Sequence, residues 1–205
     1  MESILYHDGN RQLQDQFDSR RISDRLEEKL ARKEFNADDK AFIEGSIYFF
    51  IATADAEGRP DCSFKGGPAG FVQVTAPNEL AFPDYDGNGM FKSLGNVLVN
   101  PNVGLLFIAL HDKPKRLRVN GTAKVSRDDP LLSRCTGAQL IVRVTANAIF
   151  PNCPRYIPTM KIVEQSPYVP AAGCPPLEPA WKGFADFKDA VHPRQATANI
   201  PGEKP

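Results

Sequence analysis

The sequence of 205 residues has no excess of charge of either sign. It contains 25 Lys and Arg residues against 25 Asp and Glu residues, which gives a formal net charge of +0. Proteins that bind nucleic acids or anionic membranes in a general way carry a basic excess. The even balance therefore predicts neither kind of partner, although it is compatible with a local basic pocket for one small anion.

The sequence also lacks long apolar runs. No stretch approaches the ~20 residues that a membrane-spanning helix needs, and the first residues, MESILYHDGN, have neither the basic start nor the apolar run of a signal peptide. The four cysteines form no Cys-x-x-Cys pair. We therefore expect a cytoplasmic protein with free thiols and no membrane partner.

Histidine is scarce, and two common cofactor motifs are missing. The three histidines, His7, His111 and His192, share no spacing typical of metal ligands, so we expect no metal site. No G-x-G-x-x-G segment is present, which argues against a dinucleotide such as FAD bound in the manner of doubly wound folds.

The N-terminal part has helical periodicity. Apolar residues at near-helical spacing predict one helix from about Asn10 to Phe35, and a second short helix is expected from Asp38 to Glu44. The apolar residues of the longer pattern are Leu13, Phe17, Ile22, Leu26 and Leu30.

The middle of the chain has the pattern of an antiparallel β protein. Short apolar or alternating runs are separated by turn residues, and one helical pattern, from Asn88 to Asn100, is inserted among them. No βαβ repeat is visible, so six or seven strands would close into an antiparallel barrel. The predicted strands are 47–53, which we expect to be fully buried, 62–65, 71–75, 79–82, 104–110, 117–125 and 139–150.

The last third of the chain is rich in proline. Eleven of the 18 prolines lie from Pro151 onward, which predicts an irregular extension rather than a second core. The expected organisation is an N-terminal helical extension over 1–41, a barrel domain over 42–150 and a Pro-rich extension over 151–205. The single tryptophan, Trp181, lies in this extension, where an interface position is favoured over stacking on a ligand.

A first candidate binding segment is Ser63-Phe64-Lys65-Gly66-Gly67. A predicted strand ends here in a hydroxyl, a lysine and two glycines. Glycines let backbone N–H groups approach an anion closely, and the lysine adds a charge. The alternative is a surface turn with a solvated lysine.

A second candidate segment leads from the strand end at Asp84 through Gly87-Asn88-Gly89 into the inserted helix. The first N–H groups of a helix are unpaired and its N-terminus is electropositive, so this point is suited to a phosphate. Lys92 and Ser93 would add a cation and a hydroxyl. The alternative is simple capping of the helix by Asp86 or Asn88.

A third candidate is the basic run from Lys113 to Arg118, with four cations in six residues. It is either a patch for an acidic ligand or the solvated face of a turn and strand. The binding interpretation is stronger for Arg116 and Arg118, which lie within a predicted strand.

Together these segments resemble the FMN-binding split β-barrel superfamily of pyridoxamine 5'-phosphate oxidase. The resemblance covers about 42–125 well and 139–150 loosely. It is carried by Ser63-Phe64-Lys65-Gly66, Gly87-Asn88-Gly89, Leu94-Gly95-Asn96, Asn100-Pro101-Asn102-Val103-Gly104-Leu105-Leu106-Phe107 and Leu117-Arg118-Val119-Asn120-Gly121-Thr122-Ala123, in that order.

The resemblance implies a mainly β (α+β) split barrel that binds FMN at the interface of a homodimer, so that both subunits contribute to each cofactor site. Ser63, Lys65, Lys92 and Asn88 match positions near the FMN phosphate, Phe64 and Asp84 match backbone or ring contacts, and Arg116 matches a residue that reaches the partner's flavin. The full set of residues expected at the cofactor is Ser63, Phe64, Lys65, Gly66, Asp84, Asn88, Lys92, Ser93, Asn96, Arg116 and Arg118.

The C-terminus departs from the true pyridoxamine-phosphate oxidases, which end in a tryptophan and an arginine-rich segment that hold the substrate phosphate. Vitamin B6 oxidation is therefore not predicted. We expect an FMN-dependent oxidoreductase acting on a small molecule, with no catalytic acid or base identified. The alternatives are a deazaflavin site that uses Lys113–Arg118, a haem site with His111 as ligand, and a flavin-binding sensor without turnover.

Overall fold

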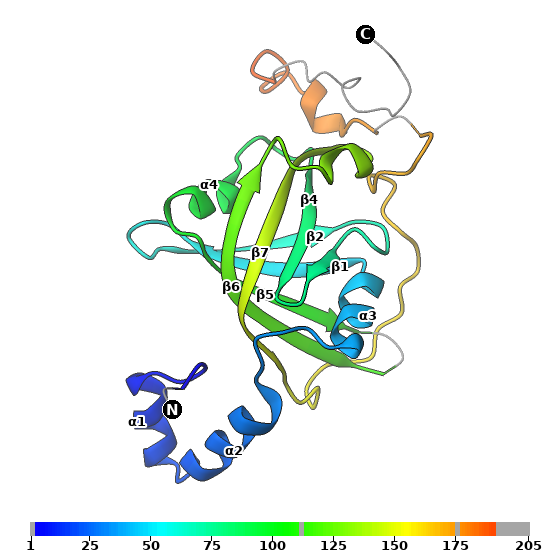
Figure 1. Cartoon of the computed structure of the whole chain (residues 1–205). Coiled ribbons are helices and arrows are strands. Elements are labelled where there is room, and N and C mark those ends of the chain that lie inside the picture. Colours follow the sequence, from blue (N-terminus) through cyan, green and yellow to red (C-terminus); the bar gives the residue numbers. More distant parts are fainter. Residues whose placement is uncertain (1–2, 111–112, 175–176, 192–205) are drawn as a thin grey trace.

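The computed structural model describes residues 3–110, 113–174 and 177–191. Over these residues the chain forms one seven-stranded antiparallel sheet in the order β2-β1-β5-β6-β7-β4-β3, which curls into an open barrel (Figure 1). Within this part of the chain the end strands β2 and β3 are not paired with each other, so the barrel is split. The predicted mainly β split barrel with helices is confirmed.

The strands are β1 (Tyr48–Ala54), β2 (Pro60–Gly66), β3 (Gln73–Ala76), β4 (Glu79–Tyr85), β5 (Asn102–Ala109), β6 (Lys115–Ser126) and β7 (Ala138–Pro151). The helices are α1 (Asp8–Gln16), α2 (Arg20–Leu30), α3 (Ala37–Gly45) and α4 (Lys92–Val99), with two short 3-10 turns, η1 (Leu132–Arg134) and η2 (Ala180–Gly183).

The prediction of one helix from Asn10 to Phe35 is wrong. The chain breaks between α1 and α2, where Asp18 adopts a left-handed conformation with φ 47°, which cannot continue a right-handed helix. After α2, Arg32 leaves the helix and exchanges backbone hydrogen bonds with Ile149 of β7 at 3.0 and 2.7 Å. The spacing of apolar residues could not reveal these breaks, because it continues unchanged from α1 into α2.

The two N-terminal helices project from the barrel (Figure 1). Their mutual contact is polar and includes an ion pair of 2.6 Å between Arg11 and Asp24. The apolar residues of this region are exposed, for example Phe17 at 75%. In a single chain the periodic apolar residues of this region therefore do not form a core.

The core lies inside the barrel and centres on three aromatic rings. Phe49 packs against Phe82 and Phe107 with ring centroids 4.9 and 5.1 Å apart, and all three are buried. The expectation that strand 47–53 is buried on both faces is wrong, because Phe49 and Ile51 point inward while Ala52 is exposed. Strands of an antiparallel barrel have one inner and one outer face, even when the sequence is apolar on both.

A bulge between Asn120 and Gly121 shifts the register of β6 against β7. A Cβ atom at Gly121 would lie 2.2 Å from the carbonyl oxygen of Thr145, so only glycine fits this approach. The bulge lies where the two longest strands bend around the core.

Helix α4 begins at Lys92, four residues later than predicted, because the residues before it form the loop from Asp86 to Phe91. Of the residues after β7, those that the structure describes contain only η2 as regular structure. All four cysteines are free. In the described ranges, no helix has the length and apolar character needed to cross a membrane.

Candidate cofactor site

The alternation of strand β2 divides the first candidate segment between two faces of the sheet. Asp61, Ser63 and Lys65 are partly buried, whereas Cys62 and Phe64 are exposed on the opposite face. Strand β2 lies at the edge of the sheet, paired only with β1 among the described strands, and α4 packs against it. The inner residues of β2 therefore face the start of α4.

Three side chains meet between β2 and α4. The Ser93 hydroxyl lies 2.8 Å from that of Ser63 and 3.0 Å from a carboxylate oxygen of Asp61. Ser63 in turn donates to Asp61 at 3.4 Å. The structure thus brings together two residues from separate predicted segments, and it adds a carboxylate that the sequence analysis did not identify.

A second cluster lies at the ends of β2 and β4. Lys65 Nζ is 3.4 Å from Asp84 Oδ1, and the two side chains are 22% and 9% exposed. Gln139 donates from Nε2 to Asp84 Oδ2 at 2.9 Å and to the Tyr85 carbonyl at 3.1 Å. Asp84 is therefore fixed from two sides, by Lys65 and by Gln139.

Burial raises the pKa of the neighbouring Tyr85 well above its ordinary value, and the nearby Cys135 adds to the shift. Its phenol is therefore neutral across the physiological pH range. Tyr85 contributes to the Asp84 cluster through its backbone carbonyl, which accepts from Gln139.

The start of α4 has no side-chain cap among the described residues. Its N-cap residue is Phe91, which adopts a left-handed conformation with φ 48°. The proposed capping by Asp86 or Asn88 is wrong: Asn88 Oδ1 accepts from the Met90 N–H at 3.0 Å, and Asp86 pairs with Lys182. The N-terminal end of α4 therefore keeps its electropositive character.

Three more of the predicted residues lie on α4 or at the end of β2. Lys92 is exposed in the first turn of α4. Asn96 is buried and donates to the Thr53 hydroxyl at 3.0 Å, which ties α4 to β1. Gly66 follows Lys65, and a Cβ atom there would lie 2.8 Å from the Phe64 ring.

Three predicted residues lie on the outer face of the sheet. Phe64 is 61% exposed and stacks on Tyr48 with centroids 5.6 Å apart. Arg118 lies over the Phe150 ring at 5.9 Å, and Arg116 is half-buried. One chain does not bring these residues to the Ser63–Ser93 cluster.

Two buried polar atoms on this side of the molecule have no hydrogen-bond partner in the described chain, namely Arg116 Nε and Tyr48 Oη. A buried donor without an acceptor costs about 1–3 kcal/mol. The outer face carries an apolar row as well, because Phe50 is paired with both Phe64 and Leu106 in the register of the sheet.

Asp61 and Gln139 were not recognised from the sequence. Asp61 carried a usable signal, because it precedes Ser63 by two residues and must share its face of the strand. Gln139 carried none, because it lies 54 residues from Tyr85 in the chain and meets it only through the β4–β7 pairing.

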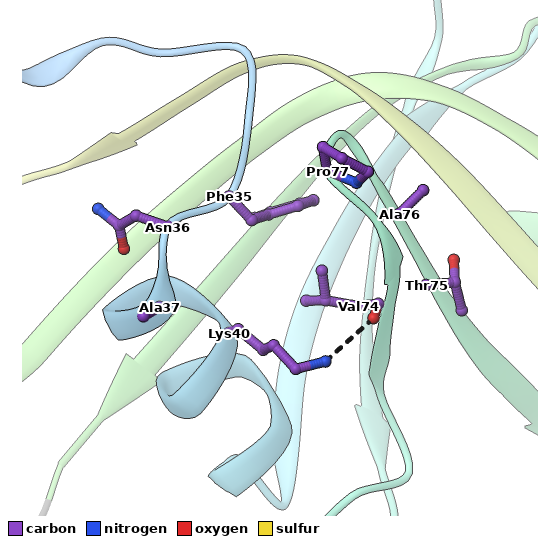
Figure 2. A pocket seen from close by; sticks show the side chains of 8 residues that line it. All are labelled: Phe35, Asn36, Ala37, Lys40, Val74, Thr75, Ala76 and Pro77. Carbon is purple, nitrogen blue, oxygen red and sulfur yellow. Dashed lines mark hydrogen bonds between the residues drawn. The ribbon is translucent and has the colours of Figure 1, made fainter.

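A shallow pocket of about 270 Å³ lies elsewhere, between α3 and β3 (Figure 2). Phe35, Val74 and Pro77 line it, and Lys40 crosses it to donate to the Val74 carbonyl at 3.2 Å. The lysine is also paired with Glu44 at 2.8 Å. None of the residues expected at the cofactor lines this pocket, and we assign it no role.

The family model described as "Pyridoxamine 5'-phosphate oxidase" matches residues 35–169 of the sequence, which is more than half of the chain. The sequence matches no curated protein significantly.

Several solved structures are similar to part of this chain. HupZ from Group A Streptococcus has 16% identity and a TM-score of 0.45, with 57% of this chain and 93% of that chain covered. The haem storage protein HutZ from Vibrio cholerae has 19% identity and a TM-score of 0.40, with 55% and 90% covered. An FMN-binding protein from Syntrophomonas wolfei has 10% identity and a TM-score of 0.42, with 69% and 97% covered. Because these TM-scores are below 0.5, the assignment of the chain to a family rests on the family model alone.

Proposed function

The chain belongs to the pyridoxamine 5'-phosphate oxidase family, and on this premise we propose that it binds FMN and works as an FMN-dependent oxidoreductase on a small molecule. The observation that carries the proposal is the meeting of Ser63 and Ser93 beside the uncapped start of α4, with Lys65 on the same face of β2. Bound flavin would supply the electron transfer, and the protein would bind and orient it.

The donors of this cluster suit a phosphate monoester. A phosphate of this kind carries about two negative charges near neutral pH and accepts several hydrogen bonds. The hydroxyls of Ser63 and Ser93, the ammonium group of Lys65 and the first N–H groups of α4 offer donors of three kinds. Lys92, exposed in the first turn, adds a second positive charge at the entrance.

Asp61 opposes this assignment electrostatically. Its carboxylate accepts from Ser93 and would repel a phosphate placed against the same hydroxyl. We infer that FMN binding rotates the serine hydroxyls away from Asp61 and toward the phosphate. The Asp61 carboxylate would therefore lower the affinity for FMN, and removing its charge by mutation would measure this effect.

We propose further that the protein is a homodimer in which the outer sheet face of one copy lies against the other. The apolar row containing Phe50, Phe64 and Leu106 favours such a contact, because water-exposed apolar faces of this kind are typical of interfaces. The unpartnered Arg116 Nε is consistent with an acceptor supplied from outside the chain, either by the second copy or by its flavin. Arg116 and Arg118 would then serve the partner's cofactor.

The test of the FMN proposal is reconstitution of the purified protein. We expect a yellow protein that binds added FMN tightly, releases FMN rather than FAD on denaturation, and is bleached by a chemical reductant and recovers in air. A protein that takes up no flavin, or that shows the spectrum of haem or a deazaflavin instead, contradicts the proposal. His111, the residue named for a haem ligand, lies outside the described residues.

Oxidoreductase activity is tested separately from binding. Bleaching by a nicotinamide donor followed by reoxidation with an added acceptor supports turnover. An FMN-loaded protein that no nicotinamide donor and no small-molecule substrate reduces contradicts the enzyme and favours a flavin-binding sensor.

A further inference from the structure

The C-terminal extension returns along the barrel to the ends of the two strands that carry Lys65 and Asp84 (Figure 1). After β7 the Met160 N–H donates to the Leu110 carbonyl at the end of β5. Gln165 then donates from Nε2 to the Gly67 carbonyl at 3.3 Å, two residues beyond Lys65. The extension therefore contacts the chain just after β2, two residues beyond the candidate phosphate-binding residue Lys65.

The later part of the extension makes an ion pair with the loop before α4. Lys182 of η2 binds Asp86, two residues beyond Asp84, and its side chain is only 7% exposed. Glu178 lies 3.9 Å from the same ammonium group. A buried lysine is costly unless it is paired, so this contact with the partly exposed Asp86 carboxylate favours one position of η2 on the loop.

The segment that presents Lys182 has a small apolar contact of its own. Trp181 packs edge-on against Phe187 with ring centroids 6.0 Å apart. The Lys182 N–H donates to the Pro179 carbonyl, and the Phe184 N–H donates to that of Trp181, at 3.1 and 3.0 Å. These contacts order the backbone of the segment on both sides of the lysine.

The loop that Lys182 holds is short and strained. It runs from Asp86 to Phe91, and Phe91 has the left-handed conformation, which is unfavourable for a non-glycine residue. Exposed side chains dominate this loop, including Met90 at 71% exposure, so little burial opposes its movement. An anchor at Asp86 limits the positions that the start of α4 can adopt.

We propose that Lys182 is a positioning residue for the cofactor: by holding Asp86, it fixes the loop that sets the start of α4 against Ser63 and Lys65. This inference rests on the proposed FMN site and deepens it, because it assigns a role to the C-terminal extension, most of which lies beyond the matched residues 35–169. Lys182 does not touch the phosphate donors themselves. It acts through Asp86 on the geometry that they form.

The test compares three variants of the full-length protein. Lys182→Met keeps an unbranched side chain of similar size and removes the charge, and Lys182→Arg keeps the charge. Lys188→Met removes an exposed lysine of the same segment as a matched control. Two quantities are measured in each: the dissociation constant of FMN, and amide hydrogen exchange of residues 86–91 without flavin. The melting temperature verifies that each variant is folded.

We expect Lys182→Met to speed exchange in the loop and to weaken FMN binding about tenfold, the factor that corresponds to about 1.4 kcal/mol. Lys182→Arg should restore most of both properties, and Lys188→Met should resemble the wild type. Wild-type FMN affinity and unchanged loop exchange in Lys182→Met would overturn the inference. So would faster exchange with unchanged affinity, since the anchor would then not act on the site.

Failure of the FMN proposal is a distinct result. If the wild-type protein binds no FMN, the proposed function is wrong, and positioning of a cofactor falls with it, whatever the exchange experiment shows. If the wild-type protein binds FMN and only the effect of Lys182→Met is missing, the site stands and the role of Lys182 is wrong.

Discussion

The hydroxyl groups of Ser63 on β2 and Ser93 on α4 lie 2.8 Å apart, although 30 residues separate them in the chain. This contact joins the edge strand of the barrel to the first turn of its one inserted helix in the described structure. It defines the place where we expect the FMN phosphate, and the residues around it are Lys65, Lys92 and Asp61.

Replacing Lys65 with alanine should weaken FMN binding by about one to two orders of magnitude, because a charge-assisted contact contributes about 1.5–3 kcal/mol. Lys92→Ala should have a smaller effect, since its side chain is exposed and its charge is screened by solvent. Titration of each variant with FMN, followed by flavin fluorescence, measures both. Lys124→Ala on the exposed face of β6 is the control. Wild-type affinity in both Lys65 and Lys92 variants would place the phosphate elsewhere.

Replacing Asp61 with asparagine should tighten FMN binding. The change removes a negative charge next to the serine hydroxyls, and two unit charges about 4 Å apart in water repel by about 1 kcal/mol, which is roughly fivefold in affinity. The gain should shrink as salt is added, because screening reduces the repulsion in the wild type. The exposed Asp128→Asn is a matched control. Weaker binding of Asp61→Asn would mean that the carboxylate supports the cofactor rather than opposing it.

Arg116→Ala should weaken FMN binding without dissociating the dimer, because its proposed partner is the neighbouring copy's cofactor. Arg127→Ala, an exposed arginine at the end of the same hairpin, is the control. Light scattering and FMN titration on the same samples separate the two effects. Loss of the dimer with intact affinity would assign Arg116 to the interface instead.

Phe64→Glu should convert the dimer to a monomer. The side chain is 61% exposed in a single chain, so the substitution should leave the stability of the monomer within about 0.5 kcal/mol of its original value. A charge on the apolar face would nevertheless oppose pairing of two copies. A wild-type protein that is already monomeric by light scattering, with FMN fully bound, contradicts the shared-site arrangement.

The strands could be predicted because runs of alternating apolar and polar residues, separated by turn residues, are typical of an antiparallel barrel. The strand from Leu117 to Val125 is an example: its predicted bounds fall inside β6, which extends from Lys115 to Ser126. The break at Asp18 was not predictable, because a left-handed residue leaves no mark on apolar spacing. The inner and outer faces of β1 were also hidden, since Phe49 and Phe50 are the same residue type.

Within the candidate site, sequence patterns indicated residues that lie in one segment, and they did not indicate contacts between distant strands. Ser63, Lys65 and Ser93 stand out locally, and the structure brings Ser63 and Ser93 together. The partners Gln139 and Lys182 depend on sheet pairing and on the return of the extension, which no local pattern encodes. Asp61 lay within reach of the strand alternation.

An acid-stability measurement tests the ion pair between Asp129 and Arg143, which joins the loop after β6 to β7. The Arg143 guanidinium lowers the pKa of Asp129 below its ordinary value, so the carboxylate stabilises the fold above the unfolded pKa of about 3.9 and loses this effect as the pH falls through the folded pKa. Asp129→Asn should therefore lower the melting temperature at neutral pH, and the difference from the wild type should shrink below about pH 4. A constant difference across this range would contradict the role of the charge.

The most direct measurement is the absorption spectrum of the purified protein after incubation with FMN and removal of the excess, followed by identification of the cofactor released on denaturation. We predict a flavin spectrum with about one FMN per chain, and its loss in the double variant Ser63→Ala and Ser93→Ala with the fold intact. A folded wild-type protein that retains no flavin, or a double variant that retains it fully, would contradict the FMN site between β2 and α4.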